Sequence, residues 1–198
     1  MNLTGIILSG GLSSRMGTDK ALILLDKEKM IEKSIHLLKP LCNEILISAN
    51  KKNYNQFGYK VIKDKHKKIG PLGGIISCLS ESKNEINIII SCDTPNIKIE
   101  TLKALLQEIK EYDVALPYHN NRYEPLIAVY NKKCLEKLKI MANSSSYKLQ
   151  TVINNLNSKR VILKDDFETE EEFININSKK DLKRYYKLRK KEIEHDKY

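Results

Sequence analysis

The segment LSGGLSSRMGTDKALILL, residues 8–25, combines three glycines, one arginine and one lysine directly after an apolar run. Gly10 and Gly11 allow main-chain N–H groups to approach an anion closely, because glycine has no Cβ in the way. Arg15 and Lys20 can add charge-assisted hydrogen bonds to phosphate oxygens. The segment therefore predicts a phosphate-binding loop, and the simpler alternative is an ordinary strand-to-helix turn that favours glycine.

The spacing of this loop differs from two familiar phosphate-binding signatures. A Walker A motif needs glycine and lysine side by side, whereas Thr18 and Asp19 separate Gly17 from Lys20. The loop does not match the dinucleotide pattern G-x-G-x-x-G either. A phosphate site of another class is therefore indicated.

Asp93 is the next residue whose position suggests chemistry. It follows the continuous apolar run at 86–91, which is typical of a buried strand. A carboxylate near a phosphate loop can hold Mg²⁺, which binds through one or two carboxylates and through substrate oxygens. We expect Asp93 to be a metal ligand, and the alternative is that it only begins a turn with Thr94 and Pro95.

The elements that must position these residues alternate between strand-like and amphipathic segments. Expected strands cover residues 5–8, 44–50, 59–64, 86–93, 113–118, 124–130, 160–163 and 173–177. Expected helices cover residues 29–41, 99–112, 131–142, 146–156 and 178–191, with Ser178 as an N-cap, and a loop leading into a helix covers 70–82. This alternation predicts β-α-β units around a mostly parallel sheet, within a single α/β domain over residues 1–198.

Small or polar residues follow several of these strands at the edge where ligands of parallel sheets bind. Ser9, Asn50, Asp64 and Asp93 all occupy such positions. We therefore expect them to lie close together. For Asn50 and Asp64 the alternative is that they cap turns.

Two further polar groups lie later in the chain. Asn175 and Asn177 alternate along the expected strand 173–177, so both should point to one face, near the metal or an acceptor or on an ordinary polar surface. Arg122 and His119 lie in the polar segment YHNNRYEP and could contact an anion. For His119 we favour a plain surface histidine.

Composition limits the remaining possibilities. The net charge is +10, and nine basic residues lie in the last twenty, so residues 178–198 form a basic helix and tail that we interpret as a solvated surface with no nucleic-acid role. No apolar run approaches the ~20 residues needed to cross a membrane, and we expect a cytoplasmic protein. The four cysteines lack metal-site spacing and should be reduced, with Cys92 in the core.

Taken together, these motifs resemble a known family. The run from Leu8 to Lys20 resembles the signature of Rossmann-like nucleotidyltransferases, and its ending MGTDK is similar to that of the molybdenum cofactor guanylyltransferases. SAN, KVIKD with GPLGGI, CDTP, RYEPLIAVY and FININSKKDL match the same family in order, as far as Leu182. Ser9 departs from the more common alanine, and the segment beyond Lys187 lies outside the pattern.

The resemblance implies a three-layer Rossmann-like nucleotidyltransferase fold and a reaction. GMP would pass from GTP to the terminal phosphate of Mo-molybdopterin, with Mg²⁺ as cofactor and pyrophosphate as the leaving group. Cofactor-delivery proteins or apo-molybdoenzymes would be transient partners. Alternatives are a cytidylyltransferase for the same cofactor, a sugar-phosphate nucleotidyltransferase, or a non-catalytic nucleotide-binding protein.

The resemblance also implies roles for individual residues. Arg15, Lys20 and Asp93 would be catalytic, and Asp93 would hold the metal. Arg122, Asn175 and Asn177 would bind the acceptor. The nucleotide would contact Leu8, Ser9, Gly10, Gly11, Lys20, Asn50, Asp64, Gly70 and Asp93.

Overall fold

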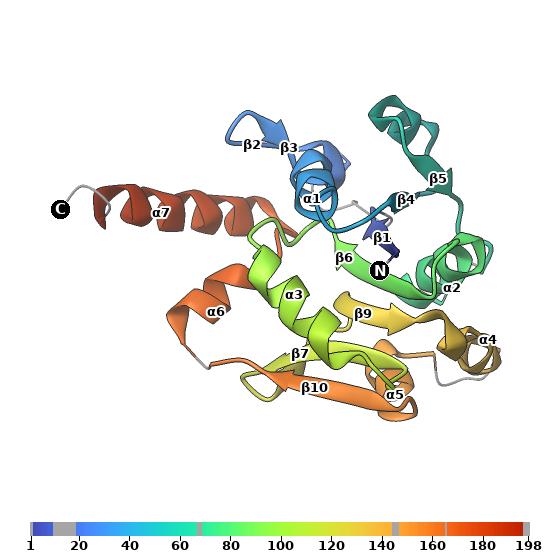
Figure 1. Ribbon diagram of the computed structural model, residues 1–198. Coiled ribbons are helices and arrows are strands. Elements are labelled where there is room, and N and C mark those ends of the chain that lie inside the picture. Colours follow the sequence, from blue (N-terminus) through green and yellow to red (C-terminus); the bar gives the residue numbers. More distant parts are fainter. Residues whose placement is uncertain (1, 10–18, 67–68, 144–146, 165, 196–198) are drawn as a thin grey trace.

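The computed structural model describes residues 2–9, 19–66, 69–143, 147–164 and 166–195. Its centre is an eight-stranded sheet with the order β10-β7-β9-β6-β1-β4-β5, in which β8 also pairs with β7 (Figure 1). The strands are β1 (Leu3–Leu8), β4 (Glu44–Ser48), β5 (Lys60–Ile62), β6 (Ile86–Ser91), β7 (Val114–His119), β8 (Arg122–Tyr123), β9 (Ile127–Asn131) and β10 (Ser158–Ile162). A separate hairpin consists of β2 (Leu24–Leu25) and β3 (Glu28–Lys29).

Strand direction confirms the predicted, mostly parallel arrangement. β1 runs parallel to both β4 and β6, β4 to β5, and β7 to β10. β9 lies between β6 and β7 and is antiparallel to both, so β6 and β7 run in the same direction. The carboxyl ends of β1, β4, β5, β6 and β7 therefore meet at one edge of the sheet.

Helices cover both faces of this sheet, which gives the three layers expected. The helices are α1 (Met30–Leu38), α2 (Pro71–Glu81), α3 (Ile99–Glu108), α4 (Leu135–Ala142), α5 (Leu149–Asn154), α6 (Phe167–Glu172) and α7 (Lys179–His195), with shorter 3₁₀ turns η2 (Lys20–Leu22), η3 (Lys52–Phe57) and η4 (Lys132–Cys134). One apolar cluster contains residues of α1 and α3, and a second contains residues of α2, α4 and α5.

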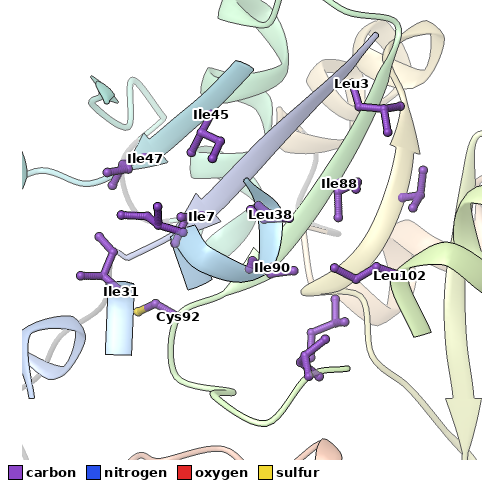
Figure 2. Close-up of a cluster of buried hydrophobic side chains, with 14 of the residues drawn as sticks. Leu3, Ile7, Ile31, Leu38, Ile45, Ile47, Ile88, Ile90, Cys92 and Leu102 are labelled. Carbon is purple, nitrogen blue, oxygen red and sulfur yellow. The ribbon is translucent and has the colours of Figure 1, made fainter. Parts of the chain in front are cut away.

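The alternation of side chains along β1 separates these two clusters. Ile7 is fully buried on one face, together with Ile31 and Leu38 of α1 and Leu102 of α3 (Figure 2). Its neighbour Ile6 is equally buried, but in the cluster on the opposite face. Full burial of each such side chain contributes roughly 1.5–3 kcal/mol, so a central strand with two apolar faces is stable only inside a three-layer fold.

One strand prediction is wrong. Residues 173–177 form no strand, although burial alternates from Ile174 to Asn177 after the buried Phe173. The segment connects the end of α6 to the start of α7 and lies beyond the ends of the sheet strands, where the Ile176 amide donates a single hydrogen bond to the Asp93 carbonyl (2.8 Å). Alternating apolar and polar residues show only that one side of a segment is buried and the other is exposed. Here the apolar side packs against the protein without any strand pairing.

The helix α7 begins as predicted and is attached to the rest of the chain through its first half. The Ser178 hydroxyl accepts a hydrogen bond from the Asp181 amide (3.3 Å), which is an N-cap contact. Tyr185 donates to the Asp26 carboxylate in the β2–β3 turn (2.9 Å), and Tyr186 donates to the Leu24 carbonyl (3.3 Å). The helix extends to the left of the sheet in Figure 1. None of the helices within the described ranges has the length and apolar character to cross a membrane.

These contacts predict the effect of shortening α7. Deletion of residues 189–198 should leave the melting temperature nearly unchanged, because both tyrosine contacts precede the cut. Deletion of residues 178–198 removes both contacts and should lower the melting temperature clearly. Thermal denaturation of both truncations checks this, and a clear loss of stability in the shorter deletion would contradict it.

Candidate active site

The register of the parallel strands brings several predicted residues to one edge. Leu8 pairs with Ser48 on one side and with Ser91 on the other, and Ser48 pairs with Ile62. The residues that follow these positions therefore surround a common space, a cavity of about 580 Å³ that we call the first cavity. Its lining includes Leu8, Ser9, Asn50, Asp64 and Gly70, all predicted to bind nucleotide.

Asn50 and Asp64 lie at the rim of the first cavity, where each side chain accepts a hydrogen bond from the main chain of the 64–66 loop. The Asp64 amide donates to Asn50 Oδ1 (3.0 Å), and Asp64 Oδ1 accepts a hydrogen bond from the His66 amide (2.8 Å). Gly73 lies directly behind this carboxylate, since a Cβ at that position would be 2.5 Å from Asp64 Oδ1. Both side chains therefore make the turn-capping contacts considered as an alternative, and they also line the cavity.

The amino terminus of α2 forms another wall of the first cavity. Gly70 has φ +62° and ψ −146°, a conformation open in practice only to glycine, and Pro71 begins the helix. In the segment GPLGG, Gly70 therefore has the unusual backbone conformation, and the remaining four residues form the first turn of α2. Gly74 allows the helix to approach β4 closely, because a Cβ there would lie 2.6 Å from Ser48 Oγ.

Lys20, Asp93 and Asn177 meet beside the first cavity. Lys20 Nζ lies 3.1 Å from Asp93 Oδ2 and also donates to Asn177 Oδ1 at 2.5 Å. The side chains of Lys20 and Asp93 are 20% and 17% exposed, so the pair is partly shielded from water. These three residues, predicted separately, therefore form one charged cluster.

Asp93 connects the first cavity to a second one. Ser91, in the lining of the first cavity, donates to Asp93 Oδ1 (2.6 Å). Thr94, the next residue, donates to Asn175 Oδ1 (2.8 Å), and Asn175 lines a polar cavity of about 390 Å³ that we call the second cavity. Predicted acceptor residue Arg122 lies in that lining too, together with His119, Glu124, Phe173 and Arg184.

The expectation that His119 is a surface histidine is wrong. Its side chain is 2% exposed, its ring stacks on Phe173 with centroids 4.5 Å apart, and its Nε2 lies 3.3 Å from Glu124 Oε1. Burial raises the pKa of the Glu124 carboxyl, and the nearby His119 and Arg122 partly oppose that shift. The polar residues around His119 in the sequence suggested exposure, but segment 173–177 covers this end of β7.

The cysteines take no part in this chemistry. All four are free thiols, and burial raises the pKa of each to about 12. Cys92, beside Asp93 in the sequence, belongs to the apolar cluster on the α1 side, as predicted (Figure 2). Neutral buried thiols are inert, so a covalent cysteine intermediate has no support here.

Comparison with known proteins agrees with this geometry. Residues 5–161 match the family described as MobA-like NTP transferase domain. A probable molybdenum cofactor guanylyltransferase of Natranaerobius thermophilus is 35% identical over 91% of this chain and 93% of that protein. The chain belongs to the MobA-like NTP transferase family. It is therefore an enzyme of the nucleotidyltransferase class.

Other members and solved structures agree. A protein of Shewanella putrefaciens named molybdenum cofactor guanylyltransferase is 30% identical over 75% of this chain and 80% of its own length. The crystal structure of molybdopterin-guanine dinucleotide biosynthesis protein A from Archaeoglobus fulgidus has a TM-score of 0.79 and 24% identity, covering 95% of this chain and 99% of that one. The similarity to this crystal structure supports the fold described above for the MobA-like transferase.

Some predicted residues remain outside this description, and some site residues were missed. Gly10, Gly11 and Arg15 lie outside the described residues of the transferase, so their roles stay predictions. Sequence reasoning did not select Asp19 or Tyr54, although both line the first cavity. Asp19 stood inside the quoted motif, whereas an isolated tyrosine in KKNYNQFGYK carries no signal of its own.

The position of Gly73 leads to a test of the first cavity. Gly73→Ala should raise the Kd for a magnesium nucleoside triphosphate about tenfold, because the added methyl overlaps with both the Asp64 carboxylate and the His66 carbonyl and must displace them. Calorimetry measures the affinity. Gly58→Ala is the control, since nothing lies within 4 Å of the Cβ position of Gly58 and this residue does not line the first cavity. Equal affinities for both variants would contradict the assignment of this cavity to the nucleotide.

Proposed function

We propose that this enzyme transfers GMP from GTP to the terminal phosphate of Mo-molybdopterin, forming the molybdopterin guanine dinucleotide cofactor. Relatives named for this activity match most of the chain, as reported above. The observation that carries the proposal is that hydrogen bonds link the Lys20–Asp93 pair to both cavities, through Ser91 to the first and through Thr94 and Asn175 to the second. A transfer enzyme must place donor and acceptor on opposite sides of the reacting phosphorus.

The chemistry needs little covalent help from the protein. An oxygen of the acceptor's terminal phosphate attacks the α-phosphorus of GTP, and the bond from that phosphorus to the bridging oxygen of the β-phosphate breaks. Pyrophosphate leaves with the electron pair. Because the attacking phosphate is already an anion, no strong general base is required, and catalysis rests on positioning and on neutralising charge.

The first cavity would hold GTP. The Lys20 ammonium would turn from Asp93 toward the α-phosphate and the leaving pyrophosphate, while Asn50, Asp64 and Gly70 would border the nucleoside. Gly10, Gly11 and Arg15 are assigned to the phosphates on the strength of the sequence motif. Main-chain groups around Leu8 and Gly70 are our candidates for reading the guanine edge.

The second cavity would hold the acceptor. Its lining is mixed in charge: Arg122 and Arg184 could pair with an anionic molecule, and Asn175 adds an amide. The carboxylates of Glu124, Glu170 and Asp181 line the same cavity. Asn175 is one hydrogen bond from Thr94, so an acceptor bound here lies close to Asp93. Docking of delivery proteins or of apo-molybdoenzymes near this cavity stays a prediction.

The residues around Asp93 fit a magnesium ion. Asp93 Oδ2 and Asn177 Oδ1 already converge on one cation, the Lys20 ammonium, and both are the hard oxygen ligands that Mg²⁺ prefers. The described residues include no group of three or more acidic, histidine or cysteine side chains that could bind a metal by themselves. Asp93, with Asn177, would thus hold an ion that arrives with the triphosphate, and that ion would neutralise phosphate charge.

Replacement of Asp93 tests this assignment. Asp93→Asn keeps the size of the side chain and an acceptor for Ser91, but it removes the negative charge. Turnover should fall by ~10²–10³ or more, as for other groups that stabilise the transition state electrostatically. Pyrophosphate release measures the rate, and circular dichroism shows whether the variant is folded. A folded variant with activity within threefold of wild type would refute the metal assignment.

Base selectivity tests the guanylyl assignment. In the presence of Mg²⁺, GTP should raise the melting temperature clearly more than ATP, CTP or UTP. The triphosphate is common to all four nucleotides, so any difference must come from groups that pair with the base. A wrong base leaves buried polar groups without a hydrogen-bond partner, which weakens its binding. At about 100 Kd of ligand the stabilisation is ~2.7 kcal/mol, which thermal denaturation resolves. Equal shifts would refute guanine selectivity, and a larger shift with CTP would indicate a cytidylyltransferase.

A further inference from the structure

Tyr54 is a buried tyrosine whose hydroxyl reaches the candidate active site. It lies in η3, shortly after β4, and its side chain is 1% exposed. The ring belongs to the same apolar cluster as Ile7 and Ile47, and its centroid lies 6.4 Å from that of Phe57. Packing of the ring therefore sets the position of the phenol oxygen.

The hydroxyl has two acceptors within reach. Asp19 Oδ1 lies 2.7 Å from the phenol oxygen, and the Ser9 carbonyl lies 3.1 Å from it. A phenol donates one hydrogen, and the shorter contact to a charged carboxylate is the stronger bond. The longer contact is then the weaker branch of a shared hydrogen bond.

These two acceptors stand on either side of the glycine-rich segment 10–18. Ser9 continues from β1, and its amide donates to the Ser48 carbonyl (3.0 Å). Asp19 precedes η2, and its carbonyl accepts a hydrogen bond from the Leu22 amide (3.0 Å). One hydroxyl thus connects the residue before the segment to the residue after it.

Asp19 in turn immediately precedes Lys20, whose ammonium contacts Asp93. The other carboxylate oxygen of Asp19 accepts from Lys51 Nζ at 3.2 Å. The Lys51 side chain is 61% exposed, so this ion pair adds little in water. The buried tyrosine is therefore the stronger restraint on Asp19 and on the direction in which Lys20 leaves the backbone.

We propose that Tyr54 is a positioning residue for phosphate binding and transfer. By holding Ser9 and Asp19 together, its hydroxyl positions the two residues that flank segment 10–18 and places Lys20 toward Asp93. Tyr54 lines the first cavity, but its hydroxyl acts through Ser9 and Asp19 and not on the reacting atoms. The inference rests on the proposed function, because it assumes that Lys20 and this segment serve the triphosphate.

The Tyr54 hydroxyl stays protonated, so it can hold Asp19 in place at any working pH. Burial, followed by the hydrogen bond and the charge of Asp19, raises the pKa of the Tyr54 hydroxyl well above its ordinary value. The group therefore stays a neutral donor throughout the working pH range. An ionised phenol beside the Asp19 carboxylate would repel it instead.

The test compares two tyrosines that make the same kind of bond. Tyr54→Phe removes the hydroxyl and keeps the ring. Tyr185→Phe is the matched control, because Tyr185 is also 1% exposed and donates to an aspartate, Asp26, at 2.9 Å in the contact between α7 and the hairpin. Both variants lose one buried hydrogen bond, so both should melt at somewhat lower temperature than wild type.

Two measurements separate positioning from stability, both made well below the melting temperatures. The first is kcat with the nucleoside triphosphate that the wild type turns over best. The second is the affinity for inorganic triphosphate, a probe that lacks base and sugar. Loss of a hydrogen bond to a charged group corresponds to about ten- to a hundredfold, and Tyr54→Phe should lose that much in kcat, in affinity or in both. Tyr185→Phe should match wild type in both.

The outcomes distinguish this inference from the proposed function. If Tyr54→Phe equals Tyr185→Phe in kcat and in triphosphate affinity, Tyr54 is merely structural and the inference is overturned. If the wild type prefers another nucleotide over GTP, the guanylyl assignment fails while the comparison of the variants proceeds with that nucleotide. If the wild type transfers no nucleotide, the affinity for inorganic triphosphate alone decides.

Discussion

One ammonium group joins three distant parts of the chain. Lys20 Nζ contacts Asp93 and Asn177, which are 73 and 157 residues away along the sequence. Such a meeting is possible only because β1 and β6 are paired in register, so that the chain leaves both strands at the same edge, and because α7 begins just past that edge. The sheet register is thus the condition for the charged cluster, and the cluster is the condition for the proposed chemistry.

The cluster also sets the charge balance of the candidate site. Lys20 and Asp93 are both partly buried, so each would be costly without an opposite charge nearby. A triphosphate offers Lys20 a new anionic partner and leaves Asp93 in need of a cation. A nucleotide that arrives with Mg²⁺ satisfies both groups at once, which is a physical reason for metal and nucleotide to bind together in the proposed reaction.

Much of the fold was predictable from periodicity. β6, with six consecutive buried residues, and the amphipathic α1 and α3 are long regular patterns that the sequence shows directly. The hairpin β2–β3 was missed because two residues per strand are too few for a pattern. A strand was wrongly predicted at residues 173–177, because alternating apolar and polar residues also occur in an unpaired segment that packs one side against the protein.

In the candidate site, too, some residues could be predicted from local sequence patterns and others could not. Lys20, Asp93, Asn50 and Asp64 were predictable because each follows a strand of a parallel sheet or belongs to a dense motif. The burial of His119 was not, because it depends on Phe173, a partner far away in the sequence. Tyr54 was not either, since its hydroxyl matters only through Ser9 and Asp19, and this contact exists only after folding.

The type of reaction proposed explains why the site depends on contacts that form only after folding. When the attacking group is already an anion, a reactive side chain adds little, and the protein's contribution is to hold charges where they are needed. The described residues agree with that division of labour. The thiols are neutral, and the buried histidine pairs with Glu124 in the second cavity. What surrounds Asp93 is a set of hydrogen bonds from Ser91, Lys20 and the Ile176 amide that determine its orientation. In such a site, residues that touch no substrate can affect the rate as much as residues that do.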